Sequence, residues 1–117
     1  MAAKRNEKLG RQLNKDLSQL FLKNKHEWFN GEFITISDVQ VTPDLSIAKV
    51  YVSLYNADKK EAILHSLESK NYLIRRELAK IVKNAMKKVP ELRFKEDKSL
   101  EVLNKLDDLL DKVRKED

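Results

Sequence analysis

The chain has 117 residues and a net charge of +5 at pH 7, from 24 basic and 19 acidic residues. A chain of this length predicts a single domain, residues 1–117, that buries about two-thirds of its unfolded surface. The absence of cysteine excludes disulfides and thiolate metal sites, and no segment approaches the roughly 20 apolar residues of a membrane span. Residues 1–10 carry no apolar signal-peptide core, so we expect a cytoplasmic protein that does not bind membranes.

The positive charge is concentrated in two segments. Residues 4–15 carry five basic residues against one acid, and residues 70–95 carry nine against two, so the other segments together are negative. This asymmetry favours a localised surface that faces a polyanion. Helical lysines are often only solvated, however, and the charge pattern alone leaves both interpretations open.

The first predicted element is a helix over residues 4–24. Its apolar stripe consists of Leu9, Leu13, Leu17, Leu20 and Phe21. The following stretch, NKHEWFNGEF, breaks the helical period, and Asn30-Gly31 is typical of a turn. We expect Trp28 and Phe29, which lie in this break, to close the edge of the core rather than to stack on a nucleobase.

A β-hairpin is predicted next. A strand over residues 32–42 keeps Val39 on the same face as Ile36 only if a bulge near Ser37-Asp38 adds a residue. The turn Thr42-Pro43-Asp44 is too short for a parallel crossover, so the second strand runs antiparallel. That strand alternates strictly. Its inward residues are Ala48, Val50, Val52 and Leu54, and its solvent-facing residues are Lys49, Tyr51, Ser53 and Tyr55.

Two helices that meet at a kink follow the hairpin. Asn56 or Asp58 is expected to cap the first helix, whose inward residues are Ile63, Leu64 and Leu67. The period is interrupted at residues 69–71, and Asn71 is the residue best able to adopt unusual backbone angles there. The inward residues of the second helix are Leu73, Ile74, Leu78, Ile81, Val82 and Ala85.

A short strand and a last helix complete the chain. Pro90 begins the strand, ELRFKE, in which Leu92 and Phe94 alternate. Asp97 or Ser99 is expected to cap the last helix, whose inward residues are Leu100, Leu103, Leu106, Leu110 and Val113. The predicted fold class is therefore α+β, in the order α-β-β-α-kink-α-β-α, with the helices on one face of a three-stranded sheet.

No catalytic constellation is present in the sequence. The only histidines are His26 and His65, and without cysteine they make a metal site improbable. The two glycines, Gly10 and Gly31, cannot form a glycine-rich phosphate loop. We therefore expect no catalysis, no cofactor and no metal.

The basic residues are the candidate site, with RNA as the expected ligand. Four of them recur at i, i+4, i+7 and i+11 and so share one helix face: Arg76, Lys80, Lys83 and Lys87. Such a face can lie along a phosphate backbone. Tyr72 at the kink is a candidate for stacking, although a half-buried helical position is the slightly preferred interpretation. The predicted RNA-binding residues are Arg5, Lys8, Arg11, Lys15, Lys70, Arg75, Arg76, Lys80, Lys83, Lys87 and Lys88.

Three segments resemble the bacterial ribosome-binding factor A family and follow one another in the order found in that family. They are FITISDVQVTPDLSIAKVYVSL, IRRELAK and VPELRFKEDKSLE. The resemblance implies a type II KH-like fold and a non-enzymatic factor that binds the small ribosomal subunit or its precursor during assembly. It further implies a link with late processing of small-subunit rRNA and with growth in the cold. At the kink the family usually carries an alanine-x-glycine motif, whereas this chain has Ser69-Lys70-Asn71-Tyr72.

A different class of function is also compatible with the sequence. The last helix is acidic, through residues such as Asp107, Asp108 and Asp111, and a protein-interaction module could dock a basic ribosomal protein there. RNA binding and protein docking differ in salt dependence, because phosphate neutralisation releases counterions. In either case we expect a monomer.

Overall fold

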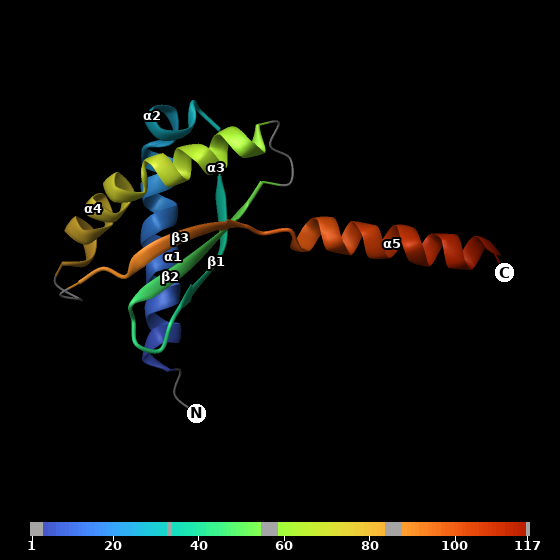
Figure 1. The fold of residues 1–117 in the computed structure, drawn as a ribbon, viewed down its shortest axis with the longest axis horizontal. Coiled ribbons are helices and arrows are strands. Elements are labelled where there is room, and N and C mark those ends of the chain that lie inside the picture. Colours follow the sequence, from blue (N-terminus) through green and yellow to red (C-terminus); the bar gives the residue numbers. More distant parts are fainter. Residues whose placement is uncertain (1–3, 33, 55–58, 84–87, 117) are drawn as a thin grey trace.

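The computed structural model describes residues 4–32, 34–54, 59–83 and 88–116. It shows a body of packed helices and strands from which one helix projects (Figure 1). The elements in chain order are α1 (Arg5–Lys23), α2 (Lys25–Phe29), β1 (Thr35–Val41), β2 (Ile47–Ser53), α3 (Lys60–Ser69), α4 (Asn71–Val82), β3 (Glu91–Glu96) and α5 (Ser99–Glu116). The α+β class is confirmed, and so is the predicted order apart from the additional short helix α2; up to β3 this is the arrangement of a type II KH-like fold. None of the described helices is long and apolar enough to cross a bilayer.

The sheet is mixed, in the order β1-β2-β3. β1 and β2 are antiparallel, as predicted, and β2 and β3 are parallel. The predicted bulge is confirmed: Ile36 pairs with Val52 and Asp38 with Tyr51, so Ser37 is the extra residue. This insertion returns the apolar residues of β1 to the inward face.

The hairpin turn is built around Asp44, as the sequence suggested. One carboxylate oxygen of Asp44 accepts hydrogen bonds from Thr42 Oγ1 at 2.6 Å, Ser46 Oγ at 2.7 Å and the Ser46 backbone N–H at 3.1 Å. Leu45 has a φ of 63°, which is uncommon for a residue with a side chain. The three bonds to Asp44 hold the turn in this conformation.

The core lies between the sheet and the helices α1, α3 and α4. Val50 and Val52 of the central strand are 0% exposed, as are Leu13 and Leu17 of α1. At the upper edge in Figure 1, α2 occupies the stretch predicted to be irregular, because residues 25–29 complete a short helix. The aromatic prediction there is confirmed, since Trp28 and Phe29 are buried and their rings pack edge-on against Phe21.

The kink between α3 and α4 differs from the prediction in one residue. Lys70 separates the helices, with φ −99° and ψ 6°, whereas Asn71 is the first residue of α4. The prediction that Asn71 adopts the unusual angles is therefore wrong. Its side chain acts instead, because Asn71 Nδ2 donates to the Leu92 carbonyl at 2.8 Å and ties α4 to β3. The predicted caps Asn56 and Asp58 lie outside the described residues.

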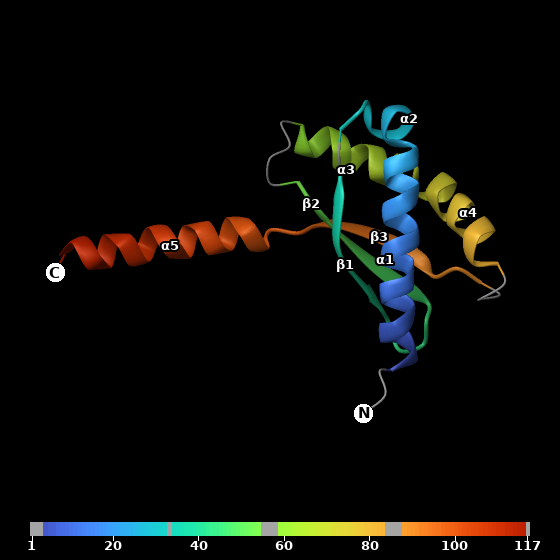
Figure 2. The ribbon, with the colours of Figure 1, turned by 180° about the vertical axis from the view of Figure 1, so that it is seen from behind.

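Two predictions about inward-facing residues are wrong. Ile81 on α4 is 47% exposed, and Ala85 lies outside the described residues. On α5 the predicted inward residues Leu103, Leu106, Leu110 and Val113 are 50–60% exposed, because the helix projects away from the body (Figures 1 and 2). The side chain of Leu100 lies outside the described part of the structure.

Asp97 directs α5 away from the sheet. Its backbone N–H donates to the Val52 carbonyl at 2.7 Å, and its carboxylate accepts from Ser37 Oγ at 2.6 Å. The same carboxylate accepts from the Ser99 N–H at 2.9 Å, so Asp97 acts at the start of α5 as predicted. Because Asp97 is bound to both β1 and β2, α5 begins at the end of the sheet, beyond the core.

Candidate nucleic-acid interface

The first basic segment lies on the outer side of α1. Four basic residues recur every three or four positions and therefore share one side of the helix. They are Arg5, Lys8, Arg11 and Lys15, and all are exposed. The opposite side, with Leu13 and Leu17, is buried against the core. The amphipathic pattern of α1 thus presents these four charges to solvent.

The second basic segment lies on α4. Arg76, Lys80 and Lys83 are exposed, while Ile74 and Leu78 on the other side are 0% exposed. Glu77 is the nearby acid, with its Oε1 3.1 Å from Lys80 Nζ and 3.9 Å from Arg76 Nη2. This one carboxylate pairs with two of the three cations, so the α4 face remains positive. Lys87, the fourth member of the predicted stripe, lies outside the described residues.

Three other predicted residues have different surroundings. Arg75 is half-buried, and its Nη2 donates to the Val89 carbonyl at 2.6 Å, which holds α4 against the segment before β3. Lys70 is half-buried at the kink, and Lys88 is exposed just before β3. The positive charge of Arg75 therefore also supports the fold.

The structure brings the two basic segments into one layer. Helices α1 and α4 are in contact and cover the same face of the sheet (Figure 2). Residues from positions 5–15 and 76–83, far apart in the sequence, therefore lie on two neighbouring helices of the same layer. We call this exposed set the basic helical layer, and it consists of Arg5, Lys8, Arg11, Lys15, Arg76, Lys80 and Lys83.

Tyr72 departs from the preferred interpretation of the sequence. Its side chain is 78% exposed, so the half-buried assignment is wrong. It lines a surface hollow of about 250 Å³ together with Arg75, Arg76, Ala79 and Val89. The signal for this exposure is present in the sequence, because Tyr72 precedes Arg76, Lys80 and Lys83 at i, i+4, i+8 and i+11 and shares their face.

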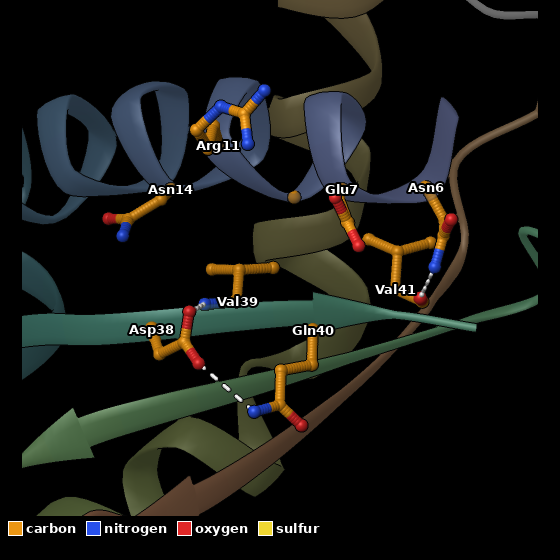
Figure 3. A pocket seen from close by; sticks show the side chains of 9 residues that line it. Asn6, Glu7, Arg11, Asn14, Asp38, Val39, Gln40 and Val41 are labelled. Carbon is orange, nitrogen blue, oxygen red and sulfur yellow. Dashed lines mark hydrogen bonds between the residues drawn. The ribbon is translucent and has the colours of Figure 1, made fainter. Parts of the chain in front are cut away.

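A second hollow, of about 330 Å³, lies along the contact between α1 and the edge strand β1 (Figure 3). Its polar groups are largely used within the fold: Asn6 Nδ2 donates to the Val41 carbonyl at 2.9 Å, and Asp38 accepts from the Val39 N–H. Arg11 lines this hollow, but Glu7 and Asp38 line it too. The mixture of charges makes it a weaker anion site than the open face of α4.

The carboxyl groups with lowered pKa values lie in turns outside the basic helical layer. Hydrogen bonds from Thr42 and Ser46 lower the pKa of Asp44 to about 2. Hydrogen bonds from Ser37 and Ser99 lower the pKa of Asp97. Both carboxylates stabilise local backbone. In the described ranges there is no group of three potential metal ligands.

One protein family matches most of the chain. The model of the family described as ribosome-binding factor A matches residues 5–110. Ribosome-binding factor A of Cytophaga hutchinsonii is 32% identical over 120 residues, which cover 100% of this chain and 90% of that protein. The protein of the same name from Staphylococcus carnosus is 36% identical over 118 residues and covers 100% of both chains.

Solved structures share the fold. A solution structure from Thermotoga maritima aligns with a TM-score of 0.68 at 27% identity, over 85% of this chain and 92% of that chain. The crystal structure of ribosome-binding factor A from Thermus thermophilus gives 0.64 at 23% identity, over 78% and 94%. A homology model of the Thermus thermophilus factor, fitted into a cryo-EM map of its 30S complex, gives 0.62 at 22% identity, over 80% and 96%.

Proposed function

The chain belongs to the ribosome-binding factor A family, and we propose that it binds the small ribosomal subunit, or a precursor of it, during assembly. The family description names ribosome binding, and the related Thermus thermophilus protein was fitted into a 30S complex. In this proposal the protein acts without catalysis, as a cytoplasmic monomer, and supports late processing of small-subunit rRNA and growth in the cold.

The basic helical layer is the observation that carries this proposal. Seven exposed cations on two neighbouring helices, α1 and α4, can approach several phosphates at once. Side chains that contact phosphates position a protein on RNA without reading its sequence. In this proposal, specificity for one subunit comes from a match between these cations and the arrangement of the phosphates in the folded rRNA.

Co-sedimentation with purified ribosomal subunits tests the proposal. The protein is expected to migrate with small subunits through a sucrose gradient and not with large subunits at the same moderate salt concentration. Its affinity is expected to fall steeply as the salt concentration rises. In a plot of log affinity against log salt concentration, each phosphate contact should contribute about 0.7 to 0.9 to the slope. Equal co-sedimentation with both subunits would refute binding specific to the small subunit.

A further inference from the structure

Tyr72 is the most exposed of the large apolar and aromatic side chains in the described residues, at 78%. Among those residues its ring makes no aromatic contact and its hydroxyl makes no hydrogen bond. By contrast, Phe21, Trp28 and Phe29 pack together in the core. An aromatic ring that is held on a helix and is 78% exposed presents a stacking surface while contributing little buried area to the fold.

The surroundings of Tyr72 combine apolar and cationic groups. The hollow beside the ring is lined by Ala79 and Val89, which contribute only small aliphatic surface, and by Arg75 and Arg76. The guanidinium of Arg75 is fixed in place by its hydrogen bond to the Val89 carbonyl at 2.6 Å. Arg76, with a side chain that is 55% exposed, remains at the rim. Nucleobases stack on aromatic rings and on guanidinium planes, and their phosphates bind adjacent cations.

We propose that Tyr72 stacks on an unpaired nucleobase of RNA, and that the hollow beside it receives that base while Arg76 and Lys80 bind the adjoining phosphates. This inference rests on the proposed function and deepens it, because it names a single-stranded nucleotide as the ligand of this part of the layer. The bases of a continuous duplex are already stacked on one another and cannot offer a face to Tyr72. The site therefore distinguishes unpaired from paired RNA, which the phosphate contacts alone do not.

Binding of two short RNA probes tests the inference. One is a single strand of about ten nucleotides that contains 2-aminopurine, whose fluorescence falls when the base stacks, and the other is a duplex of the same length. Tyr72→Ala is expected to weaken single-strand binding roughly 5-fold to 150-fold and to abolish the quenching. Tyr72→Phe, which keeps the ring, is expected to remain within about twofold of the original protein.

Ile81→Ala is the matched control, because it also removes exposed apolar surface from α4 but lies outside the hollow. It is expected to bind both probes as the original protein does. Single-strand binding by Tyr72→Ala within about twofold of the original protein would overturn the inference. An equal loss on single strand and duplex would also overturn it, because that result indicates a contact to phosphates.

Subunit co-sedimentation, run in parallel, separates this inference from the proposed function. If the protein does not bind small subunits but shows the Tyr72-dependent quenching, the proposed function is refuted and the stacking site stands. If the protein binds small subunits and its Tyr72→Ala variant still quenches 2-aminopurine as the original protein does, the proposed function stands and the stacking site is refuted.

Discussion

The carbonyl oxygen of Val39 lies so close to Gly10 that a Cβ added at position 10 would stand 2.5 Å from it. Gly10 therefore allows α1 to pack directly against the edge strand β1. Four residues earlier, Asn6 donates its side-chain amide to the Val41 carbonyl at 2.9 Å. Together these contacts cover carbonyl groups of β1 with α1, which protects an edge strand from pairing with other chains.

Gly10→Ala is expected to destabilise the protein even though alanine is the better helix former. The steric cost of overpacking is about 1–3 kcal/mol, against a gain of about 1 kcal/mol in helix propensity. Urea unfolding measures the difference. Gln19→Ala, at an exposed position of the same helix, is the control and should change the free energy of unfolding by less than about 0.5 kcal/mol. A Gly10→Ala variant more stable than the original protein would contradict the close approach.

Replacing Leu106 and Leu110 together by glutamine should leave thermal unfolding of the body nearly unchanged. Their side chains are 50% and 54% exposed on α5, so no core packing is lost. Leu17→Gln, at a position that is 0% exposed on α1, provides the contrast and should cost several kcal/mol. Calorimetry of the two variants and the original protein decides the matter, and a large loss in the α5 variant would show that this helix packs on the body.

The double variant Lys80→Ala/Lys83→Ala should fold normally, because both lysines are exposed and alanine favours helix. Its binding to small subunits should weaken, and the log–log salt slope should fall by about 1.4 to 1.8, the contribution of two phosphates. Lys105→Ala/Lys112→Ala on α5 removes the same charge and should bind as before. If charge reversal at Asp107 and Asp108 abolished binding while Lys80→Ala/Lys83→Ala did not, the interface would lie on α5.

Because of Asp44, the stability of the folded protein should depend on pH under acidic conditions. Its pKa is about 2 in the folded protein, against an ordinary value of 3.8. A carboxyl group with a depressed folded pKa stabilises the protein fully above about pH 4, and this contribution disappears as the pH falls towards about 2. Asp44→Asn should therefore lose less stability over that interval, as measured by urea unfolding at a series of pH values. Asp108→Asn, on α5, is the control, and equal pH slopes for Asp44→Asn and the original protein would contradict the prediction.

Local patterns in the sequence were sufficient to predict the hairpin. The change of parity between Ile36 and Val39 required an inserted residue, and the structure places it at Ser37. Such a pattern depends only on neighbouring residues and on the need to bury apolar side chains. Helix α1 was predictable for the same reason.

Contacts between distant segments could not be derived in this way. The amide of Asn71 bonds to Leu92, and Asp97 bonds to Ser37, 60 positions away. The first contact fixes the kink, and the second directs α5 away from the core. Periodicity identifies the apolar side of α5, but it does not identify what that side contacts.

For the candidate site, spacing predicted which basic residues of α1 and α4 share a face. It did not reveal that Arg75 is held by the Val89 carbonyl, because that bond joins α4 to a segment 14 positions away. The exposure of Tyr72 was readable from its position on the basic face of α4. A general expectation that aromatic residues are buried favoured the wrong interpretation.

The parallel pairing of β2 with β3 has a consequence for synthesis on the ribosome. β1 and β2 are joined by a short turn and can pair as soon as both have been made, within microseconds. The other side of β2 has no partner until α3 and α4 have also been made and β3 follows. A nascent chain that ends before Glu91 therefore exposes a strand edge that can pair with other chains and aggregate. The six residues of β3 end this vulnerable interval by closing the sheet.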